Sequence, residues 1–307
     1  MIYTVTLNPS LDRIIEVEEL MYDDVNEVLE EKRYPRGKGI DASRVIKKLG
    51  GQSIALGLIG GYNGLEMESR LVNEGILCDF TEIRDETRTN VIINQKRKKL
   101  QTLLSSHGPS VSDVESADFF RKIQGIPMNS FVIISGGIPV GMNDSFYAQL
   151  ITTLKGKHVR ILLDADGEPF RAGVDAGPYL IKPNIHEFGR LVKKSVNEID
   201  EIVEYSKPYE NIVEYIVVSM GARGVVGISG RGNFHVAPPK VKVRSSTGSG
   251  DSLLAGIAFV LHAGGTFEDA LAQGVACGTA TALNPGNDLC DREGIDFIKK
   301  DVIIKKI

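Results

Sequence analysis

Apolar and polar positions alternate in a regular way from residue 111 to residue 224. Short apolar runs end in small or polar residues, and segments with helical periodicity follow several of them. The expected helices are 114–123 and 146–154, and the expected strands are 131–134, 159–163, 179–182 and 216–219. Strands that alternate with helices in this way predict a parallel sheet with helices packed on its faces.

The first 73 residues show the same alternation of strands and helices, interrupted once at residues 21–34. The expected strands are 2–7, 14–20 and 53–59, and the expected helices are 41–50 and 65–73. Gly50 is expected to close the first of these helices, since glycine favours the position after a helix end. Residues 21–34 are acidic and irregular and predict no regular element.

Extended segments near 13–36 and 78–105 stand apart from the βα rhythm. They include strand-like stretches at 78–83 and 91–94, and the basic run at 96–99 is expected to be a solvated hairpin tip. We predict that these segments form a small β lid on one domain that spans residues 1–307, because no linker divides the chain.

Composition narrows the function classes. The 307 residues are 42% hydrophobic and 25% charged, as in ordinary globular proteins. The net charge of −4, from 36 basic and 40 acidic residues, argues against a general nucleic-acid or membrane-surface binder, although it leaves room for a local basic pocket.

Targeting signals and cysteine spacing bear on the cellular location of the protein. No apolar run is long enough to span a bilayer, and residues 1–7 lack the features of a signal peptide. Cys78, Cys277 and Cys290 lack metal-ligand spacing and are odd in number, which is typical of free thiols in a reducing compartment. We therefore expect a cytoplasmic protein.

The segment 245–252 carries the sharpest chemical signal. Gly248 and Gly250 allow successive N–H groups to point into one concavity, and the apolar run 253–258 predicts a helix that starts there. The free N–H groups of a helix start attract an anion, such as a phosphate in transfer. Asp251 would then accept a proton from an attacking hydroxyl, or it would only cap the helix. The segment matches neither a Walker A loop nor a Rossmann fingerprint.

Several polar or small residues are expected at the carboxyl edge of the sheet, where open α/β folds bind ligands. They are Asp12, Gly136, Asp164, Asn184, Glu187 and the loop 221–224. Asn184 and Glu187 predict either a capping box or a carboxylate that orients the water around Mg²⁺. Asp12 would cap a turn or hold sugar hydroxyls. The run 36–39 would bring backbone and the Lys38 cation close to a ligand, or would be a flexible turn.

Together, these motifs resemble the ribokinase-like carbohydrate kinases, specifically the phosphofructokinase-B-type branch. That branch includes 1-phosphofructokinases, tagatose-6-phosphate kinases and a minor class of 6-phosphofructokinase. The motifs that carry the resemblance are Thr6-Leu7-Asn8-Pro9-Ser10-Leu11-Asp12, Gly37-Lys38-Gly39-Ile40-Asp41, Thr87-Arg88-Thr89-Asn90, Ser135-Gly136-Gly137-Ile138-Pro139, Lys182-Pro183-Asn184-x-x-Glu187, Val218-Ser219-Met220-Gly221 and Thr247-Gly248-Ser249-Gly250-Asp251-Ser252.

The resemblance implies a three-layer α/β/α fold with a central, mostly parallel sheet and a small β-sheet lid. It implies an ATP-dependent kinase for a hexose monophosphate (fructose 1-phosphate, fructose 6-phosphate or tagatose 6-phosphate), with Mg²⁺ as the metal. By this resemblance, Asp251 is the general base and Gly248, Ser249 and Gly250 form the anion hole. The implied sugar-binding residues are Asp12, Gly37, Lys38, Asp41, Arg88 and Asn90. The implied Mg–ATP residues are Lys182, Asn184, Glu187, Ser219, Gly221, Gly224 and Thr247, with Glu187 serving the metal.

Three positions depart from the usual pattern of this branch. Arg36 replaces a glycine, Asp41 replaces an asparagine, and Glu27 stands where some members place a phosphate-binding arginine. An acid repels a phosphate, so these changes also allow a kinase for an unphosphorylated sugar or a nucleoside, or a sugar-phosphate sensor without turnover. The expected partners are small molecules, with no nucleic acid or membrane, and the chain is expected to be a monomer or a homodimer.

Overall fold

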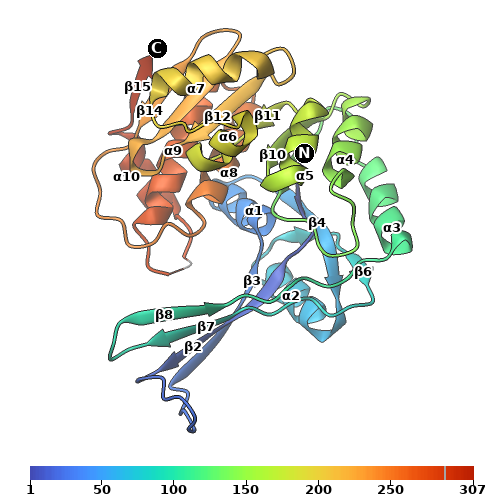
Figure 1. The fold of residues 1–307 in the computed structure, drawn as a ribbon, viewed down its shortest axis with the longest axis vertical. Coiled ribbons are helices and arrows are strands. Elements are labelled where there is room, and N and C mark those ends of the chain that lie inside the picture. Colours follow the sequence, from blue (N-terminus) through green and yellow to red (C-terminus); the bar gives the residue numbers. More distant parts are fainter. Residues whose placement is uncertain (287) are drawn as a thin grey trace.

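A large mostly parallel sheet forms the centre of the molecule, and a small second sheet projects from it (Figure 1). The computed structural model describes residues 1–286 and 288–307. Within those residues, eleven strands form the large sheet in the order β15-β14-β13-β12-β11-β10-β9-β1-β4-β5, with β6 also paired to β4. The strands from β12 to β6 pair in parallel, whereas β13, β14 and β15 extend the sheet antiparallel.

The bounds of the elements are as follows. The large sheet contains β1 (Ile2–Thr6), β4 (Ser53–Gly60), β5 (Leu77–Cys78), β6 (Thr81–Ile83), β9 (Phe131–Ser135), β10 (Arg160–Asp164), β11 (Leu180–Ile181), β12 (Tyr215–Ser219), β13 (Val225–Ser229), β14 (Phe234–Ala237) and β15 (Ile303–Lys306). The small sheet contains β2 (Ser10–Val17), β3 (Glu30–Arg36), β7 (Val91–Gln95) and β8 (Leu100–Leu104). The helices are α1 (Lys38–Lys48), α2 (Gly61–Asn73), α3 (Asp113–Gln124), α4 (Phe146–Lys155), α5 (Gly167–Asp175), α6 (Ile185–Val192), α7 (Ile199–Ser206), α8 (Ser249–His262), α9 (Phe267–Ala282) and α10 (Arg292–Lys299).

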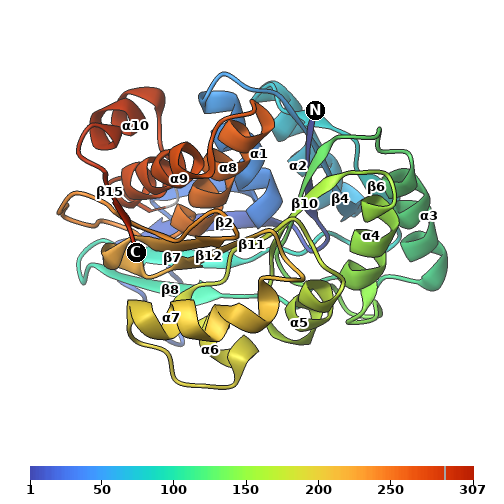
Figure 2. The same ribbon diagram turned by 90° about the horizontal axis from the view of Figure 1, so that it is seen from above.

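Two layers of helices cover the large sheet, so the expected three-layer architecture is confirmed (Figure 2). Helices α3 to α7 pack on one face, and α1, α2, α8, α9 and α10 pack on the other. Strand β9 shows why its sequence is apolar at every position. Val132 and Ile134 face the first layer while Phe131 and Ile133 face the second, so both sides of the strand are buried.

The small sheet has the order β3-β2-β7-β8. Its hairpin tip at residues 96–99 is the solvated basic turn expected from the sequence, and Arg97 and Lys98 pair there with Glu19. Residues 78–83, which were expected in the lid, instead lie in β5 and β6 and pair with β4 of the large sheet. Their short apolar runs fit a buried strand as well as a lid strand, and only the pairing partner decides between them.

Other boundaries also differ from expectation. The segment 21–34 is not wholly irregular, because β3 begins at Glu30 and pairs along its length with β2. Asp12 lies within β2 rather than after a strand, since the chain passes from β1 into β2 with only a three-residue break. Helices α1 and α2 begin earlier than predicted, at Lys38 and Gly61, through glycines that the sequence suggested were loops.

Helix α8 is held in place by a close crossing with α9. A Cβ at Gly274 would lie 2.7 Å from the Leu253 carbonyl oxygen, and one at Gly256 would lie 3.0 Å from the Gly274 Cα. The two helices therefore approach each other across glycines, which fixes the position of the α8 start. Within the described residues, no helix combines the length and apolar character that crossing a bilayer requires.

Candidate active site

A buried ion cluster lies at the carboxyl edge of the large sheet. Asp164 ends β10 with its side chain 1% exposed, and its two oxygens accept Lys38 Nζ at 3.0 Å and Lys182 Nζ at 3.1 Å. Burial alone would raise the pKa of Asp164, but the two ammonium groups outweigh it and hold that pKa below its ordinary value. The cluster therefore keeps two cations at the edge of the sheet with one carboxylate between them.

Asp251 lies in the first turn of α8 beside this cluster. The N-cap of α8 is Gly248, and the helix start has no side-chain cap, so the alternative that Asp251 only caps the helix is wrong. Burial raises the pKa of Asp251 to about 7, and the charges of Asp41 and Asp164 act in the same direction. Lys38 and Lys182 oppose this shift without cancelling it. A carboxyl with a pKa near 7 is suited to take up a proton at neutral pH.

The turn before Asp251 brings backbone N–H groups close to the ion cluster. Gly248 has φ 76°, a left-handed conformation that glycine adopts without strain. The first N–H groups of α8 have no acceptor within the helix, and the positive end of the helix dipole lies with them. Ser249 Oγ is buried without a hydrogen-bond partner among the described residues, and a Cβ at Gly250 would lie 3.6 Å from Lys182 Nζ. Donors and a cation thus converge on one small volume.

Two cavities meet at Lys38 and Asp251. The larger, of about 860 Å³, extends along β12, β13 and α8, and we call it the nucleotide cavity. The smaller, of about 280 Å³, lies between the ends of β1 and β9 and the small sheet, and we call it the acceptor cavity. Only Lys38 and Asp251 line both cavities among the described residues. At this junction, the Asp251 carboxyl and the Lys38 ammonium can contact one ligand in each cavity at the same time.

A hydrogen-bond network from the small sheet forms one wall of the acceptor cavity. Asp12 Oδ1 accepts Ser10 Oγ at 2.7 Å and Asn90 Nδ2 at 2.8 Å, which leaves its Oδ2 available for a ligand. Arg88 donates to the carbonyl oxygens of Asn8 and Ser106 at 3.0 and 3.2 Å. Asn8 Oδ1 and Arg88 Nε are buried and have no hydrogen-bond partner in the described part of the chain. Unpaired buried polar atoms are costly, so they indicate a polar ligand here.

The unusual pair Arg36 and Asp41 forms the opposite wall. Asp41 is 2% exposed and lies 3.3 Å from Arg36 Nη1 and 3.1 Å from Arg44 Nη1. Burial raises the pKa of Asp41, while the two guanidinium groups oppose that shift. Gly37 also lines this cavity, and Glu27 is exposed and lies outside its lining.

The nucleotide cavity has a polar end and an apolar end. Lys182, Asn184, Glu187, Ser219, Gly221 and Gly224 all line it, whereas Thr247 does not, although Ser246 and Gly248 on either side of it do. Asn184 and Glu187 form the expected capping box of α6, with both reciprocal hydrogen bonds present. Val225, Pro238, Val241 and Val243 provide the apolar end, which suits the flat face of a nucleobase.

Comparison with known proteins decides the family. The profile of the pfkB family of carbohydrate kinases matches residues 5–293. The chain belongs to the pfkB carbohydrate kinase family. This membership confirms the resemblance to ribokinase-like kinases of the phosphofructokinase-B type.

Individual relatives agree with this assignment. The kinase is 34% identical over 297 residues to a 1-phosphofructokinase from Borreliella burgdorferi, with 96% of this chain and 95% of the relative covered. It is 31% identical over 312 residues to a tagatose-6-phosphate kinase from Staphylococcus epidermidis, with both chains fully covered. Its fold matches the crystal structure of phosphofructokinase-2 from Escherichia coli with a TM-score of 0.93 at 28% identity, covering 97% of this kinase and 98% of that chain.

The family implies ATP as a substrate, and the cavity residues also fit a magnesium ion. No group of three or more His, Cys, Asp and Glu side chains in the described residues is arranged to hold a metal by itself. Mg²⁺ in kinases usually retains water and binds one or two carboxylates together with phosphate oxygens. Glu187 supplies one such carboxylate, because only its Oε2 accepts the Asn184 N–H in the capping box. Glu187 is therefore a candidate to hold such an ion through water.

Sequence reasoning missed two parts of the site. It identified Asp164 only as one polar residue of the sheet edge, and not as the acceptor for both lysines. It also missed the apolar end of the nucleotide cavity, since Pro238 to Val243 form an irregular segment without periodicity. A signal existed for Asp164, because it directly follows the fully apolar run 161–163.

The ion cluster leads to a stability prediction. In Asp164→Asn, the deeply buried Lys182 ammonium, 4% exposed, loses its carboxylate, so we expect a loss of about 3–5 kcal/mol in the free energy of unfolding. Urea unfolding at pH 7 measures this loss. The control is Asp166→Asn, which breaks an exposed pair with Arg190 and should cost at most about 1 kcal/mol. Equal losses in the two variants would contradict a structural role for the cluster.

Proposed function

We propose that this kinase transfers the γ-phosphoryl group of ATP to a hydroxyl of a hexose monophosphate, with Asp251 as the general base. The observation that carries the proposal is the meeting of the two cavities at Lys38 and Asp251. A nucleotide in one cavity and a sugar in the other would bring the γ-phosphorus and the attacking hydroxyl together at that junction. Such positioning supplies much of the catalysis in phosphoryl transfer.

The chemical step follows from the groups at the junction. The acceptor hydroxyl loses its proton to an Asp251 carboxylate oxygen while its oxygen forms a bond to the γ-phosphorus. The bond from that phosphorus to the β,γ-bridging oxygen breaks, and ADP leaves with the electron pair. Lys38, Lys182 and the N–H groups at the α8 start are placed to stabilise negative charge on the transferring group. Magnesium, when bound, would neutralise charge on the nucleotide phosphates.

Arg88 supports an acceptor that carries a phosphate. Arg88 lines the acceptor cavity, and within the described residues its guanidinium donates to two carbonyl oxygens and has no carboxylate partner. Burial lowers the pKa of Arg88 from its very high ordinary value, and Asp12 opposes this shift. A guanidinium that has no carboxylate partner retains its capacity to bind phosphate. Glu27 is exposed, so the expected repulsion of a phosphate does not arise in the cavity.

We also propose that the small sheet acts as a lid. Ser10 and Asp12 of β2, Arg36 of β3, and Arg88 and Asn90 ahead of β7 all line the acceptor cavity. A sheet that supplies the acceptor contacts can order when the sugar binds and exclude water from the reaction. Leu100, Leu103 and Leu104 of β8 remain exposed on this sheet, which favours a homodimer over a monomer.

A panel of acceptors tests the proposed substrate class. We expect ADP formation with at least one of fructose 1-phosphate, fructose 6-phosphate and tagatose 6-phosphate, at a kcat/KM about 100-fold above that for free sugars or nucleosides. The difference arises because an acceptor without phosphate leaves the half-buried Arg88 guanidinium without an anionic partner. Arg88→Gln should raise KM for the phosphorylated sugar and leave KM for free sugars unchanged. Preference for a free sugar, or binding of hexose phosphate without turnover, would contradict the proposal.

Replacement of the proposed base tests the mechanism. Asp251→Asn keeps the shape of the side chain but removes its proton affinity, so kcat should fall by about 10²–10⁴. ATP affinity, measured by calorimetry without acceptor, should remain close to that of the original chain. Asp144→Asn provides a control at an exposed carboxylate that lines neither cavity. Turnover within a factor of a few of the original would exclude Asp251 as the base.

The raised pKa of Asp251 leads to a pH prediction. The base must be deprotonated, so kcat/KM should rise with pH through a midpoint near 7 and fall tenfold per unit below it. Lys182 lowers this pKa, hence Lys182→Met should move the midpoint to higher pH. Initial rates from pH 5 to 9 measure the profile. A midpoint near the ordinary aspartate value, or a shift to lower pH in Lys182→Met, would contradict the assigned environment.

A further inference from the structure

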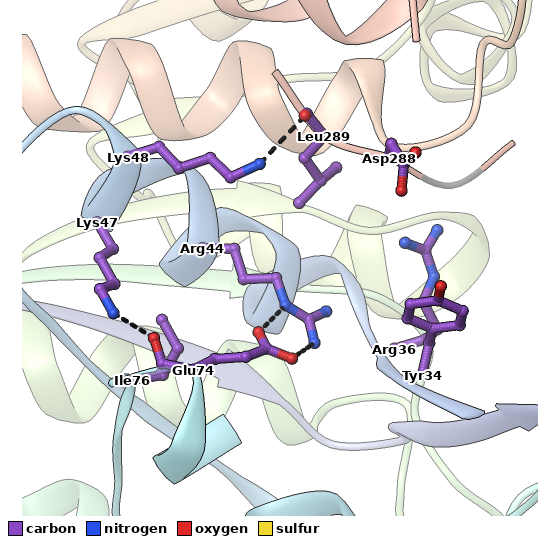
Figure 3. Close-up of a pocket in the computed structure, with 9 residues that line it drawn as sticks. All are labelled: Tyr34, Arg36, Arg44, Lys47, Lys48, Glu74, Ile76, Asp288 and Leu289. Atoms are coloured by element: carbon purple, nitrogen blue, oxygen red, sulfur yellow. Dashed lines mark hydrogen bonds and ion pairs between the residues drawn. The ribbon is translucent and has the colours of Figure 1, made fainter. Parts of the chain in front are cut away.

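A third cavity, of about 420 Å³, lies against helix α1 and shares Arg36 with the acceptor cavity (Figure 3). We call it the α1 pocket. Its side chains come from β3, from α1, from the end of α2 and its following turn, and from the segment after α9. The lining residues are Tyr34, Arg36, Arg44, Lys47, Lys48, Glu74, Ile76, Asp288 and Leu289. The volume is within the range of small-molecule sites.

The charges of the α1 pocket are mainly positive. Of the side chains that the structure describes, four cationic and two acidic ones line it, although the whole chain has a net charge of −4. Lys47 donates to the carbonyl oxygen of Glu74, and Lys48 donates to that of Leu289 at 3.1 Å. Among the described residues, neither ammonium group forms an ion pair with a carboxylate. Both can therefore pair with an external anion.

The two arginines lie deeper in the pocket. The side chains of Arg36 and Arg44 are 12% and 14% exposed, so their charges are less screened by water than those of surface residues. Arg44 forms a bidentate pair with Glu74 at 2.6 and 2.7 Å, which fixes the orientation of its guanidinium (Figure 3). Its third nitrogen donates to the Pro35 carbonyl oxygen at 2.6 Å and to Asp41 at 3.1 Å, so Arg44 contributes positive charge rather than free donors. The ammonium groups of Lys47 and Lys48 are the donors that phosphate oxygens can reach.

The α1 pocket and the acceptor cavity share a wall. Arg36 lines both, and Asp41 lies behind it, in contact with Arg36 at 3.3 Å and with Arg44 at 3.1 Å. An anion in the α1 pocket attracts Arg36 toward itself, and a phosphorylated sugar in the acceptor cavity attracts it the other way. The two ligands therefore compete for the same guanidinium.

We propose that the α1 pocket binds a small phosphate-bearing anion, which weakens binding of the phosphorylated acceptor through Arg36. The proposal that an anion binds depends only on the residues of the α1 pocket. The proposal that this anion weakens acceptor binding rests on the proposed kinase function. Coupling through a shared residue is reciprocal, so a bound acceptor weakens binding of the anion by the same factor. The class of ligand is either free phosphate or a phosphorylated metabolite, since both present the same oxygens.

Direct binding tests the site without any turnover. Titration of the full chain with inorganic phosphate, followed by calorimetry at constant ionic strength, should detect a site that is lost in Lys47→Ala/Lys48→Ala. The matched control is Lys157→Ala/Lys207→Ala. Neither lysine lines the α1 pocket: Lys157 donates to the carbonyl oxygens of Gln124 and Ile126, and Lys207 is exposed. Phosphate binding that is equal in the two double variants would overturn the site.

Kinetics tests the coupling. Saturating phosphate should raise KM for the phosphorylated acceptor about fivefold or more, with kcat unchanged, in the original chain and the control but not in Lys47→Ala/Lys48→Ala. An unaltered KM in the original chain, or the same rise in all three proteins, would overturn the coupling. Repeating the titration with glycerol 3-phosphate separates the two sources: tighter binding than phosphate indicates a metabolite, and weaker binding indicates free phosphate. If the chain proves inactive but still binds phosphate through Lys47 and Lys48, the proposed function is contradicted, whereas the proposed anion site in the α1 pocket is supported.

Discussion

The buried carboxylate of Asp164 is the constraint on which the rest of the site depends. It lies between Lys38, from the start of α1, and Lys182, which follows β11, and the buried Lys182 ammonium would be costly without it. Because the three residues come from distant parts of the chain, their pairing holds α1, β10 and β11 in register at one edge of the sheet. Asp251 reaches the same point from α8 and takes its raised pKa from burial and from this environment.

This arrangement has a cost in stability that follows from the sign of the shift. A carboxyl whose pKa rises from 3.8 to about 7 on folding binds its proton more tightly in the folded state than in the unfolded chain. Its contribution therefore favours the folded state below pH 3.8 and diminishes as the pH rises toward 7. Near neutral pH the folded chain holds Asp251 partly protonated, whereas the same carboxyl would be fully ionised in the unfolded chain. Such a group is suited to take and return a proton, which explains why a less stable arrangement can be functional.

Helix α1 joins the parts of the molecule that bind ligands. Its first residue, Lys38, lies at the junction of the nucleotide and acceptor cavities, Asp41 lies on the acceptor wall, and Arg44, Lys47 and Lys48 face the α1 pocket. These side chains follow each other at intervals of one or three residues, so one rigid helix places charge in three cavities. A shift of α1 would therefore move charged side chains in all three cavities.

The sequence alone determined the element types, the βα order and the nest-forming turn at 248–251, because these depend on local periodicity and on glycine conformations. It also predicted the acceptor and nucleotide residues, through motifs whose order along the chain resembles one family. Only the tertiary structure decided that residues 78–83 join the large sheet, that Asp12 lies inside β2, and that Asp164 pairs with two lysines. It alone revealed the α1 pocket, whose walls come from four separate segments. Strand pairing, burial and charge pairing between distant segments leave no periodic trace in a sequence, because they depend on which elements meet in space.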